Sequence, residues 1–491
     1  MQQMTRRDWL KMLVASGVVS SLPGFLFSKD SEEYQFTDQR VAVSPDNPAI
    51  IFDESKCILC GACYRVCRRM VSVTGFYDLK KTGNRPICVH CGQCSTVCEG
   101  DALLNRPEWQ TIKAAKARGQ TVVVSLSPAV RVMVSEAFGE AAGSYCEGEV
   151  IAALRALGAD YVFDTAVGAD LTIVEEAAEW VERLTKKSEA LPLPQFTSCC
   201  PSWVKFCETF YPEILPQLSQ VKSPIAIQGV LIKRFFAQQK GLKPEQIFNV
   251  ALTPCTAKKF EIRRPEMQVD GVPGMDAVIT VRELADWMRS EQIDYTALQP
   301  SQYDALVGNA SGAGVIFGNT GGVTEAILRT AYALLNQKNP PESFLTFTSL
   351  RGLKGTQDAR VGELKYATVQ LTPEMTVKVA VVQGLARVRK VLQWLKEQAI
   401  EVDFVEVMAC EGGCIGGGGT PRAKSVPYLT RAMRQARIAA LYTGDTSRKI
   451  RLAHENPLLK TLYKDELGNF GSSTAKDLLH TFYTSRASDL G

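Results

Sequence analysis

The chain has 491 residues, 45% of them hydrophobic and 22% charged, so it is long enough for several domains with substantial cores. Its 56 basic and 52 acidic residues nearly balance, and no long lysine or arginine run indicates binding to nucleic acid. Cysteines number 15 against only 3 histidines. Zinc sites usually mix the two residue types, whereas this inventory favours thiolate-ligated iron–sulfur clusters or disulfides.

The N-terminus, residues 1–28, carries a candidate export signal. Thr5–Leu13 reads TRRDWLKML, and a short apolar run follows from Met12 to Phe27. Two arginines before such a run resemble a twin-arginine signal, and the run is short for a bilayer span. An amphipathic helix is the alternative. No clear A-x-A site follows, so retention as a membrane tether remains open beside cleavage.

Export through the twin-arginine machinery would place the protein in the periplasm or at the outer face of the cytoplasmic membrane. Because this machinery carries folded proteins, clusters assembled in the reducing cytoplasm would survive export. That argument favours metal ligation over disulfides for most of the thiols. A polar stretch, residues 29–47, is predicted as a linker to the first domain.

Residues 48–105 form a short, cysteine-dense segment in which one spacing occurs twice. Each half has the pattern C-x2-C-x2-C-x3-C of a bacterial two-cluster ferredoxin, in which the fourth cysteine ligates the other cluster. The predicted ligands of one 4Fe–4S cluster are Cys57, Cys60, Cys63 and Cys98; those of the other are Cys88, Cys91, Cys94 and Cys67. A zinc ribbon or a disulfide framework is the alternative.

From residue 118 to 442 the pattern becomes that of an α/β domain. Short β-rich runs occur at Thr121–Leu126, Phe248–Leu252, Lys378–Val382 and Val402–Met408. Helical stretches lie among them, at Glu175–Leu184, Arg282–Ser290 and Ala386–Gln398. Apolar strands that alternate with helices predict parallel sheets. The last segment, 443–491, is polar and helical and is predicted to wrap the main body.

Four further ligand candidates lie in three separate motifs. These motifs are FTSCCPSW with Cys199 and Cys200, LTPCTAKKFE with Cys255, and EVMACEGGCIGGGGTPR with Cys410 and Cys414. The last two directly follow predicted strands, and the carboxyl ends of parallel strands converge on a crevice. We therefore expect Cys200, Cys255, Cys410 and Cys414 to meet around one cubane. A set of buried core cysteines is the alternative.

The three motifs, in this order after a two-cluster ferredoxin run, resemble the FeFe-hydrogenase family from about residue 48 onward. The tail sequences RLAHENPLLKTLY and LLHTFY resemble the small-subunit segment of that family. The resemblance implies two α/β lobes that enclose an H-cluster, which is a 4Fe–4S cubane bridged to a diiron unit with CO, cyanide and a dithiolate amine. It also implies dedicated maturation enzymes and a redox partner protein, a c-type cytochrome or a ferredoxin.

The same resemblance implies roles for individual residues around the cluster. Cys414 would both ligate the cubane and bridge to the diiron unit. Lys258 would donate a hydrogen bond to one cyanide, which suits a buried ammonium group beside an anion; a solvated helix lysine is the alternative. Four more positions match residues that contact the cluster in the family: Ser127, Pro128, Ser223 and Met408.

A proton relay is the predicted role of the second cysteine in the CC pair. If Cys200 is a ligand, the thiol of Cys199 is free to pass protons between the cluster and water. Glu176, Glu179 and Arg183 stand at i, i+3 and i+7 on one helical face. The family match makes the two glutamates relay acids, with the Ser219 hydroxyl between them and Arg183 as the outer partner. A solvated charge stripe is the alternative.

Several residues depart from the family pattern, among them Ser127, Asn319 and Thr324. Thr253 stands where methionine is common, Ser202 replaces a glycine, and Ile225 and Thr420 each replace a glutamine. We expect these changes to affect potential, catalytic bias or oxygen tolerance. The sequence thus predicts an exported hydrogenase that oxidises H2; the alternatives are a non-catalytic iron–sulfur protein of the same fold, either assembly factor or electron carrier, and an H2 sensor.

Overall fold

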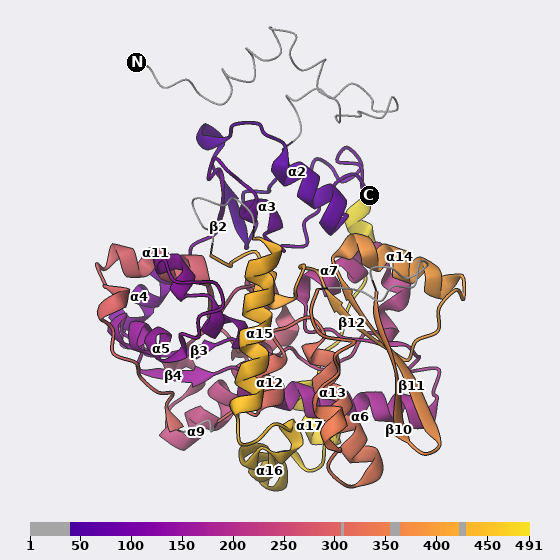
Figure 1. The fold of residues 1–491 in the computed structure, drawn as a ribbon. Coiled ribbons are helices and arrows are strands. Elements are labelled where there is room, and N and C mark those ends of the chain that lie inside the picture. Colours follow the sequence, from indigo (N-terminus) through magenta and orange to yellow (C-terminus); the bar gives the residue numbers. More distant parts are fainter. Residues whose placement is uncertain (1–39, 306–308, 354–363, 422–428) are drawn as a thin grey trace. The chain divides into compact units, whose positions relative to one another are not determined.

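The computed structural model describes residues 40–305, 309–353, 364–421 and 429–491 (Figure 1). The predicted signal, the membrane tether and most of the predicted linker therefore lie outside the described residues. Residues Arg40–Gly491 form one unit in which the ferredoxin-like segment, the α/β region and the tail pack together. None of the helices in this part of the chain is long and apolar enough to span a bilayer.

The first sheet has four parallel strands in the order β4-β3-β6-β9. Its strands are β3 (Thr121–Leu126), β4 (Tyr161–Asp164), β6 (Ile247–Thr253) and β9 (Ala277–Thr280). Almost every residue in them is buried, because helices cover both faces and apolar side chains therefore occupy both faces of the strands. This burial pattern is the one that the continuous apolar runs of the sequence predicted.

The second sheet has the order β10-β11-β12-β5 and is parallel except at one edge. Its parallel strands are β11 (Met375–Gln383), β12 (Phe404–Met408) and β5 (Gln195–Phe196). The edge strand β10 (Lys365–Thr372) pairs antiparallel with β11. β10 was not predicted from the sequence; its buried Val369 and Leu371 alternate with the exposed Thr368 and Gln370, as expected of an edge strand.

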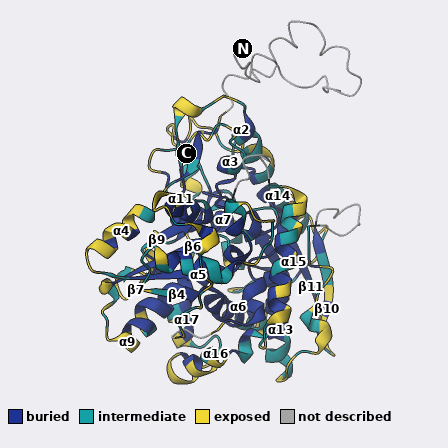
Figure 2. Ribbon diagram, turned by 60° about the vertical axis from the view of Figure 1, so that its left-hand side comes forward, coloured by how far each residue is buried: buried dark blue, intermediate teal, exposed yellow. Residues whose placement is uncertain are grey.

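One long helix, α6 (Ala166–Lys186), runs through the protein core (Figure 2). It packs against α8 (Pro224–Val230), α12 (Gly312–Ile316) and α13 (Gly322–Asn336). Sixteen of its 21 residues are buried, including carboxylates and an arginine as well as apolar side chains. A helix that is buried nearly all round must pair its charged groups internally, which marks this helix as unusual.

The remaining helices cover the two sheets or bound the cavity. They are α4 (Trp109–Ala117), α5 (Glu147–Ala156), α7 (Pro201–Phe210), α9 (Ala237–Lys240), α10 (Lys258–Glu261), α11 (Val281–Ser290) and α14 (Leu385–Lys396). A two-stranded ribbon consists of β7 (Gln268–Val269) and β8 (Val272–Pro273). The start of α11 carries a capping box between Thr280 and Glu283.

The ferredoxin-like segment is an internal duplication closed by a strand pair. β1 (Ile50–Phe52) pairs antiparallel with β2 (Leu103–Asn105), and between them lie α2 (Ala62–Val66), a π-helical turn (Cys67–Val71) and α3 (Gln93–Thr96). Gly61 and Gly92 precede the two helices at φ of 71° and 68°. These positions correspond in the repeated spacing, and both take the left-handed backbone that glycine favours.

The tail begins with a long helix and then wraps the core. It contains α15 (Arg431–Ser447), α16 (Pro457–Leu462) and α17 (Ser473–Leu479), and the predicted boundary at 442/443 falls inside α15. Leu459, Leu467 and Leu479 are fully buried in the same core as α6. The apolar residues of this polar segment therefore complete the core beneath the long helix.

Candidate active site and electron path

The carboxyl ends of four strands meet at one cavity of about 700 Å³. β3 and β6 come from the first sheet, and β5 and β12 come from the second, so the cavity lies where the two lobes face each other. This is the crevice that the strand-following motifs predicted. Nine of the predicted site residues line it: Ser127, Pro128, Cys199, Cys200, Cys255, Lys258, Met408, Cys410 and Cys414.

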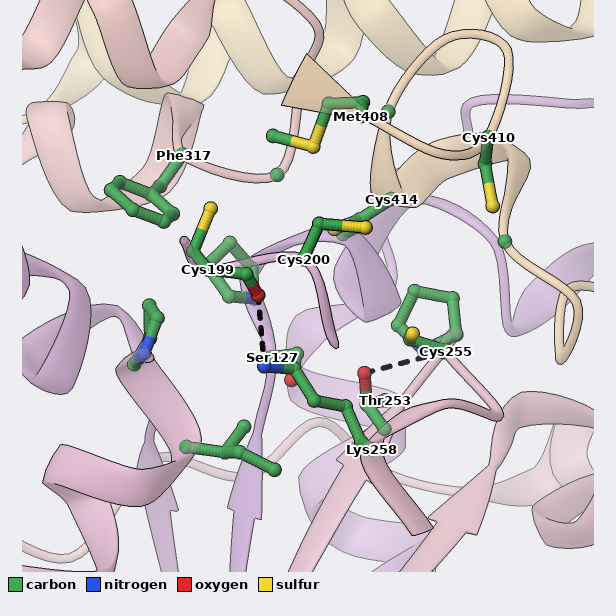
Figure 3. Close-up of a pocket in the computed structure, with 18 of the residues that line it drawn as sticks. Ser127, Cys199, Cys200, Thr253, Cys255, Lys258, Phe317, Met408, Cys410 and Cys414 are labelled. Atoms are coloured by element: carbon green, nitrogen blue, oxygen red, sulfur yellow. Dashed lines mark hydrogen bonds between the residues drawn. The ribbon is translucent and has the colours of Figure 1, made fainter. Parts of the chain in front are cut away.

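The two adjacent cysteines point to different sides of this cavity (Figure 3). The sulfur of Cys200 points toward the side where Cys255 and Cys410 lie. The sulfur of Cys199 points instead toward Phe317 and Met408. Cys200 is the N-cap of α7, with Pro201 as the first helical residue, so the chain turns between the two thiols.

Glycines allow the Cys410–Cys414 loop to reach the cavity. Gly412 and Gly413 have φ of 90° and 81°, which side chains disfavour. A Cβ on Gly413 would lie 2.8 Å from the backbone nitrogen of Thr320, and one on Gly417 would clash with the carbonyl of Pro254. The loop thus packs backbone against backbone, and its thiols are the groups that face the open space.

The donor set fits an iron–sulfur cluster. Four half-buried cysteines line the cavity, and removal from water raises the pKa of Cys255 to about 11 and that of Cys414 to about 12. Free thiols with these pKa values stay protonated at neutral pH, whereas iron displaces the proton and binds the thiolate. Four soft sulfur ligands, with the ammonium group of Lys258 beside them, suit a thiolate-bound cluster.

Lys258 lines the cavity and is held by two oxygen atoms. Its Nζ donates to the carbonyl of Cys199 at 3.0 Å and pairs with Oε2 of Glu261 at 2.8 Å. Burial opposes its positive charge, but the Glu261 carboxylate raises its pKa overall, so it stays an ammonium. Glu261 was not among the predicted site residues, although its place three residues after Lys258 on a helix is the signal for such a pair.

Ser223 lies farther from the cavity than the sequence analysis predicted. Its hydroxyl donates to Oε2 of Glu261 at 2.9 Å, and it lines a neighbouring space of about 280 Å³ rather than the main cavity. It therefore acts on Lys258 through the shared carboxylate. Thr253, one of the residues that depart from the family pattern, accepts the Cys255 backbone N–H at 3.3 Å.

The predicted relay residues form a buried chain beside Cys199. The Ser219 hydroxyl donates to Oε2 of Glu179 at 2.8 Å, and burial with the charge of Glu179 raises the pKa of Glu176 well above its usual range. Burial raises the pKa of Cys199 first, and the charge of Glu176 raises it further. Oε1 of Glu176 is buried with no hydrogen-bond partner among the described residues.

Arg183 lies at the Glu179 end of this chain. It is fully buried, pairs with Glu179 at 2.5 Å, and donates to the carbonyls of Pro192 and Pro216 at 2.8 and 3.0 Å. Arg183 is thus a buried partner of Glu179, because two loops fold over its guanidinium. Solvent lies instead at the exposed Gln220, whose backbone N–H donates to Oε2 of Glu179 at 3.0 Å.

The cysteines of the ferredoxin-like segment fall into two groups. Cys57, Cys60, Cys63 and Cys98 line a space of about 400 Å³, beside the exposed side chains of Ile58 and Leu59. In the second group burial is the main cause of the raised pKa values of Cys91 and Cys94, and the charges of Cys67 and Cys88 raise both further. The crossed pairing of the fourth cysteines, predicted from the spacing, matches this arrangement.

The second group is the one nearer to the main cavity. Nε2 of Gln93, beside Cys94, donates to Sγ of Cys410 at 3.2 Å. The first group lies at the more exposed end, where Ile58 is 61% exposed. Electrons could thus pass from the cavity to the second group, then to the first group and the surface. No residue that joins the segment to the cavity was predicted, because the contact between Gln93 and Cys410 links residues 317 positions apart in the sequence.

Comparison with protein families gives three matches along the chain. Residues 120–418 match the C-terminal domain of the iron-only hydrogenase large subunit. Residues 431–486 match the iron hydrogenase small subunit, and residues 49–99 match a 4Fe–4S dicluster domain. The small-subunit match begins with α15, which agrees with the structural start of the tail.

Similar proteins include hydrogenases and a protein that carries another name. Iron hydrogenase 1 of Clostridium pasteurianum is 35% identical over 97% of this chain and 81% of its own length. The large subunit of the periplasmic Fe hydrogenase of Nitratidesulfovibrio vulgaris is 38% identical over 84% of this chain and 95% of its own length. The protein NAR1 of Arabidopsis thaliana is 28% identical over 81% of this chain and 84% of its own length.

Solved structures resemble the chain as well. An FeFe-hydrogenase structure that shows stepwise H-cluster assembly is 36% identical, covers 76% of this chain and 98% of its own, and has a TM-score of 0.66. A solved FeFe-hydrogenase of Chlamydomonas reinhardtii, without bound cofactor, covers the same shares at 35% identity and a TM-score of 0.66. With a family match over more than half of its residues, the chain belongs to the iron-only hydrogenase family.

Proposed function

We propose that this protein is an FeFe-hydrogenase that catalyses H2 ⇌ 2H⁺ + 2e⁻ at an H-cluster. The observation that carries the proposal is the divergence of two adjacent thiols, one toward the other cysteines and one toward Phe317 and Met408. A site that only stored or carried electrons would need the four ligands alone. Cys199, Lys258 and the buried carboxylates provide for proton transfer in addition.

Cys200, Cys255, Cys410 and Cys414 would hold the cubane, and Cys414 would also bridge to the diiron unit. When bound, the H-cluster supplies the open iron position at which H2 is split or formed and the amine that exchanges protons there. Pro128, Ser127 and Met408 would pack against the diiron unit, since all three line the cavity. The Lys258 ammonium, held by Glu261 and the Cys199 carbonyl, would donate a hydrogen bond to a cyanide.

The chain itself would move protons from the cavity to water. Cys199, which its raised pKa keeps as a neutral thiol, would pass its S–H proton to Glu176 while its sulfur accepts the next proton from the cavity. Glu176 would pass it through the Ser219 hydroxyl to Glu179. Arg183, buried against Glu179, would hold that carboxylate in place, and the proton would leave near the exposed Gln220.

Electrons would leave through the second and then the first cluster of the ferredoxin-like segment to a redox protein, a c-type cytochrome or a ferredoxin. The similarity to a periplasmic hydrogenase and the TRRDWLKML motif support export by the twin-arginine machinery, H2 uptake outside the cytoplasm and an N-terminal membrane tether. Activity would also require H-cluster maturation enzymes, because the diiron unit is not assembled from thiolates and free iron alone.

The direct test of the relay is substitution of the unbound thiol. In Cys199→Ser and Cys199→Ala we expect unchanged iron content and loss of nearly all H2 turnover, because the first proton acceptor is removed. Cys207→Ser is the matched control, since Cys207 is buried in the core away from the cavity. Normal H2 activity in either Cys199 variant would overturn the relay assignment.

A second candidate is a non-catalytic role in iron–sulfur assembly. The similarity to NAR1, at 28% identity, and to cytosolic iron–sulfur assembly component 3 of Bos taurus, also at 28%, favours this reading. The buried relay beside Cys199 argues against it. H2 evolution from reduced methyl viologen by the matured protein would exclude a purely non-catalytic role.

A further inference from the structure

Gln93 lies where the ferredoxin-like segment touches the candidate active site. It is the first residue of α3, is only 6% exposed, and stands in the sequence between Cys91 and Cys94 of the second cluster. Its side-chain Nε2 donates to Sγ of Cys410 at 3.2 Å and to the carbonyl of Gly416 at 2.8 Å. Because the Gly416 carbonyl can only accept, the amide nitrogen must face it, and the second N–H then points to the sulfur.

Two glycines allow this contact. Gly92 has a φ of 68°, and a Cβ there would lie 2.5 Å from Oγ1 of Thr256 and 3.1 Å from Cα of Gly418. A Cβ on Gly418 would in turn clash with the carbonyl of Cys91. The two loops therefore meet backbone to backbone, and side chains larger than hydrogen at either position would separate Gln93 from its acceptor.

The same loop is also held without Gln93. Ser95 and Asn105 both donate to the carbonyl of Gly418, at 3.4 and 3.2 Å, and Oδ1 of Asn105 accepts from the Thr280 hydroxyl at 3.0 Å. The bond to Gly416 adds a further anchor. The bond to Sγ is thus not needed to dock the loop, and it is the one contact of Gln93 that reaches a predicted cluster ligand.

We propose that Gln93 is a positioning residue that tunes the catalytic cubane through Cys410. A hydrogen bond to a ligating sulfur stabilises the reduced, more negative form of a cluster and raises its reduction potential. Gln93 thereby favours an electron on the cubane over an electron on the neighbouring cluster of the ferredoxin-like segment. This inference depends on the proposed function, because it requires clusters on the cysteines assigned above.

The chain contains a matched bond at the neighbouring cluster. The Thr74 hydroxyl donates to Sγ of Cys67 at 3.0 Å. Gln93→Leu and Thr74→Val each remove one hydrogen bond to sulfur and replace the polar group with an apolar one of similar size. The two variants should therefore lower the potentials of two different clusters and change the difference between them in opposite directions.

The experiment is a redox titration, followed by electron paramagnetic resonance, of full-length protein produced without the maturation enzymes. In Gln93→Leu we expect one of three cluster potentials to fall, with about a tenfold loss in the equilibrium constant for electron transfer onto that cluster, or about 59 mV for one electron. In Thr74→Val a different cluster should shift. In Gln93→Glu, which keeps the shape but adds negative charge, the fall should exceed that in Gln93→Leu.

Unchanged potentials in both Gln93 variants would overturn the inference, as would a shift of the same cluster by Gln93→Leu and Thr74→Val. Iron and sulfide analysis of the unsubstituted protein separates this failure from that of the proposed function. If three clusters are present and Gln93 has no effect, only the inference fails. If the cysteines hold no cluster, the proposed function fails with it.

Discussion

Cys199 and Cys200 occupy neighbouring positions but different chemical settings. Cys200 faces the other three ligand candidates, and Cys199 faces the side of Phe317 and Met408. Because the two residues are consecutive, the turn of the chain before α7 is enough to assign one thiol to metal and leave the other for protons. The proposed function of each cysteine thus depends on the direction of its side chain, which the sequence pair CC alone does not reveal.

Glu176 supplies a test at the same scale. Glu176→Gln should lower H2 turnover by about 100-fold or more, because an amide cannot accept and release the relayed proton. Glu182→Gln, on the same helix but paired with Lys186 and Lys476, is the matched control and should retain activity. Equal activity in the two variants, measured at equal cluster content, would contradict the relay.

The raised pKa of Glu176 predicts a pH dependence of stability. The folded protein holds this proton at pH values at which the unfolded chain, with an ordinary pKa of 4.5, has lost it. The stability that protonated Glu176 contributes is therefore fully present below about pH 4.5. It is lost as pH rises through the pKa of Glu176 in the folded protein. Thermal unfolding should show that the stability of Glu176→Gln rises relative to that of the unsubstituted protein as pH increases above 4.5. A difference in melting temperature that does not change with pH would refute this.

Among the elements, the tail and α6 are joined where the relay lies. Glu175 of α6 accepts from the Tyr463 hydroxyl at 2.6 Å and from Nε2 of His480 at 2.8 Å. The Tyr483 hydroxyl donates to the carbonyl of Ser219 at 2.8 Å. The tail thus fixes both the helix that carries the relay acids and the loop that carries the relay hydroxyl.

Tyr483→Phe tests that connection. The loss of one neutral hydrogen bond should reduce the free energy of unfolding by about 0.5–1.5 kcal/mol. Phe482, which is 62% exposed, gives the control Phe482→Leu, for which we expect no measurable change in denaturant unfolding. Equal stability of the Tyr483 variant and the unsubstituted protein would show that the tail does not anchor the Ser219 loop through this bond.

Much of the element pattern and of the ligand set could be predicted from the sequence. β3 was predicted to the residue, because its first four residues are all β-branched and Gly119 and Pro128 lie close to its two ends. The burial of Arg183 and the distance of Ser223 from the cavity could not be predicted, because both depend on how distant segments pack, which local spacing does not encode. Gln93 was missed for the same reason, since only the packed fold brings it to Cys410.

For the whole molecule, surface charge bears on the choice of redox partner. The stretch between the two cysteine motifs carries exposed basic residues that have no ion-pair partner among the described residues: Arg68, Arg69, Lys80, Lys81 and Arg85. Within that stretch Phe76 is 47% exposed and Leu79 is 37% exposed. A basic surface with apolar side chains near the clusters favours a partner whose own surface is acidic.

The partner's charge can be tested by ionic strength. The rate of electron transfer from the H2-reduced protein to an acidic ferredoxin should fall as salt is raised, because screening weakens the attraction. A basic cytochrome c should react more slowly than the acidic ferredoxin at low salt, and its rate should increase as salt is raised. Stopped-flow traces with the opposite order would show that electrons do not leave across this basic surface.

The central claim, that thiolates from distant loops hold an H-cluster in the cavity between the two lobes, is tested most directly by infrared spectroscopy of the matured protein. The account predicts sharp bands from CO and cyanide ligands in the unsubstituted protein and their absence in Cys414→Ser, which lacks the bridging thiolate. A matured protein with a full complement of iron and no such bands would contradict it.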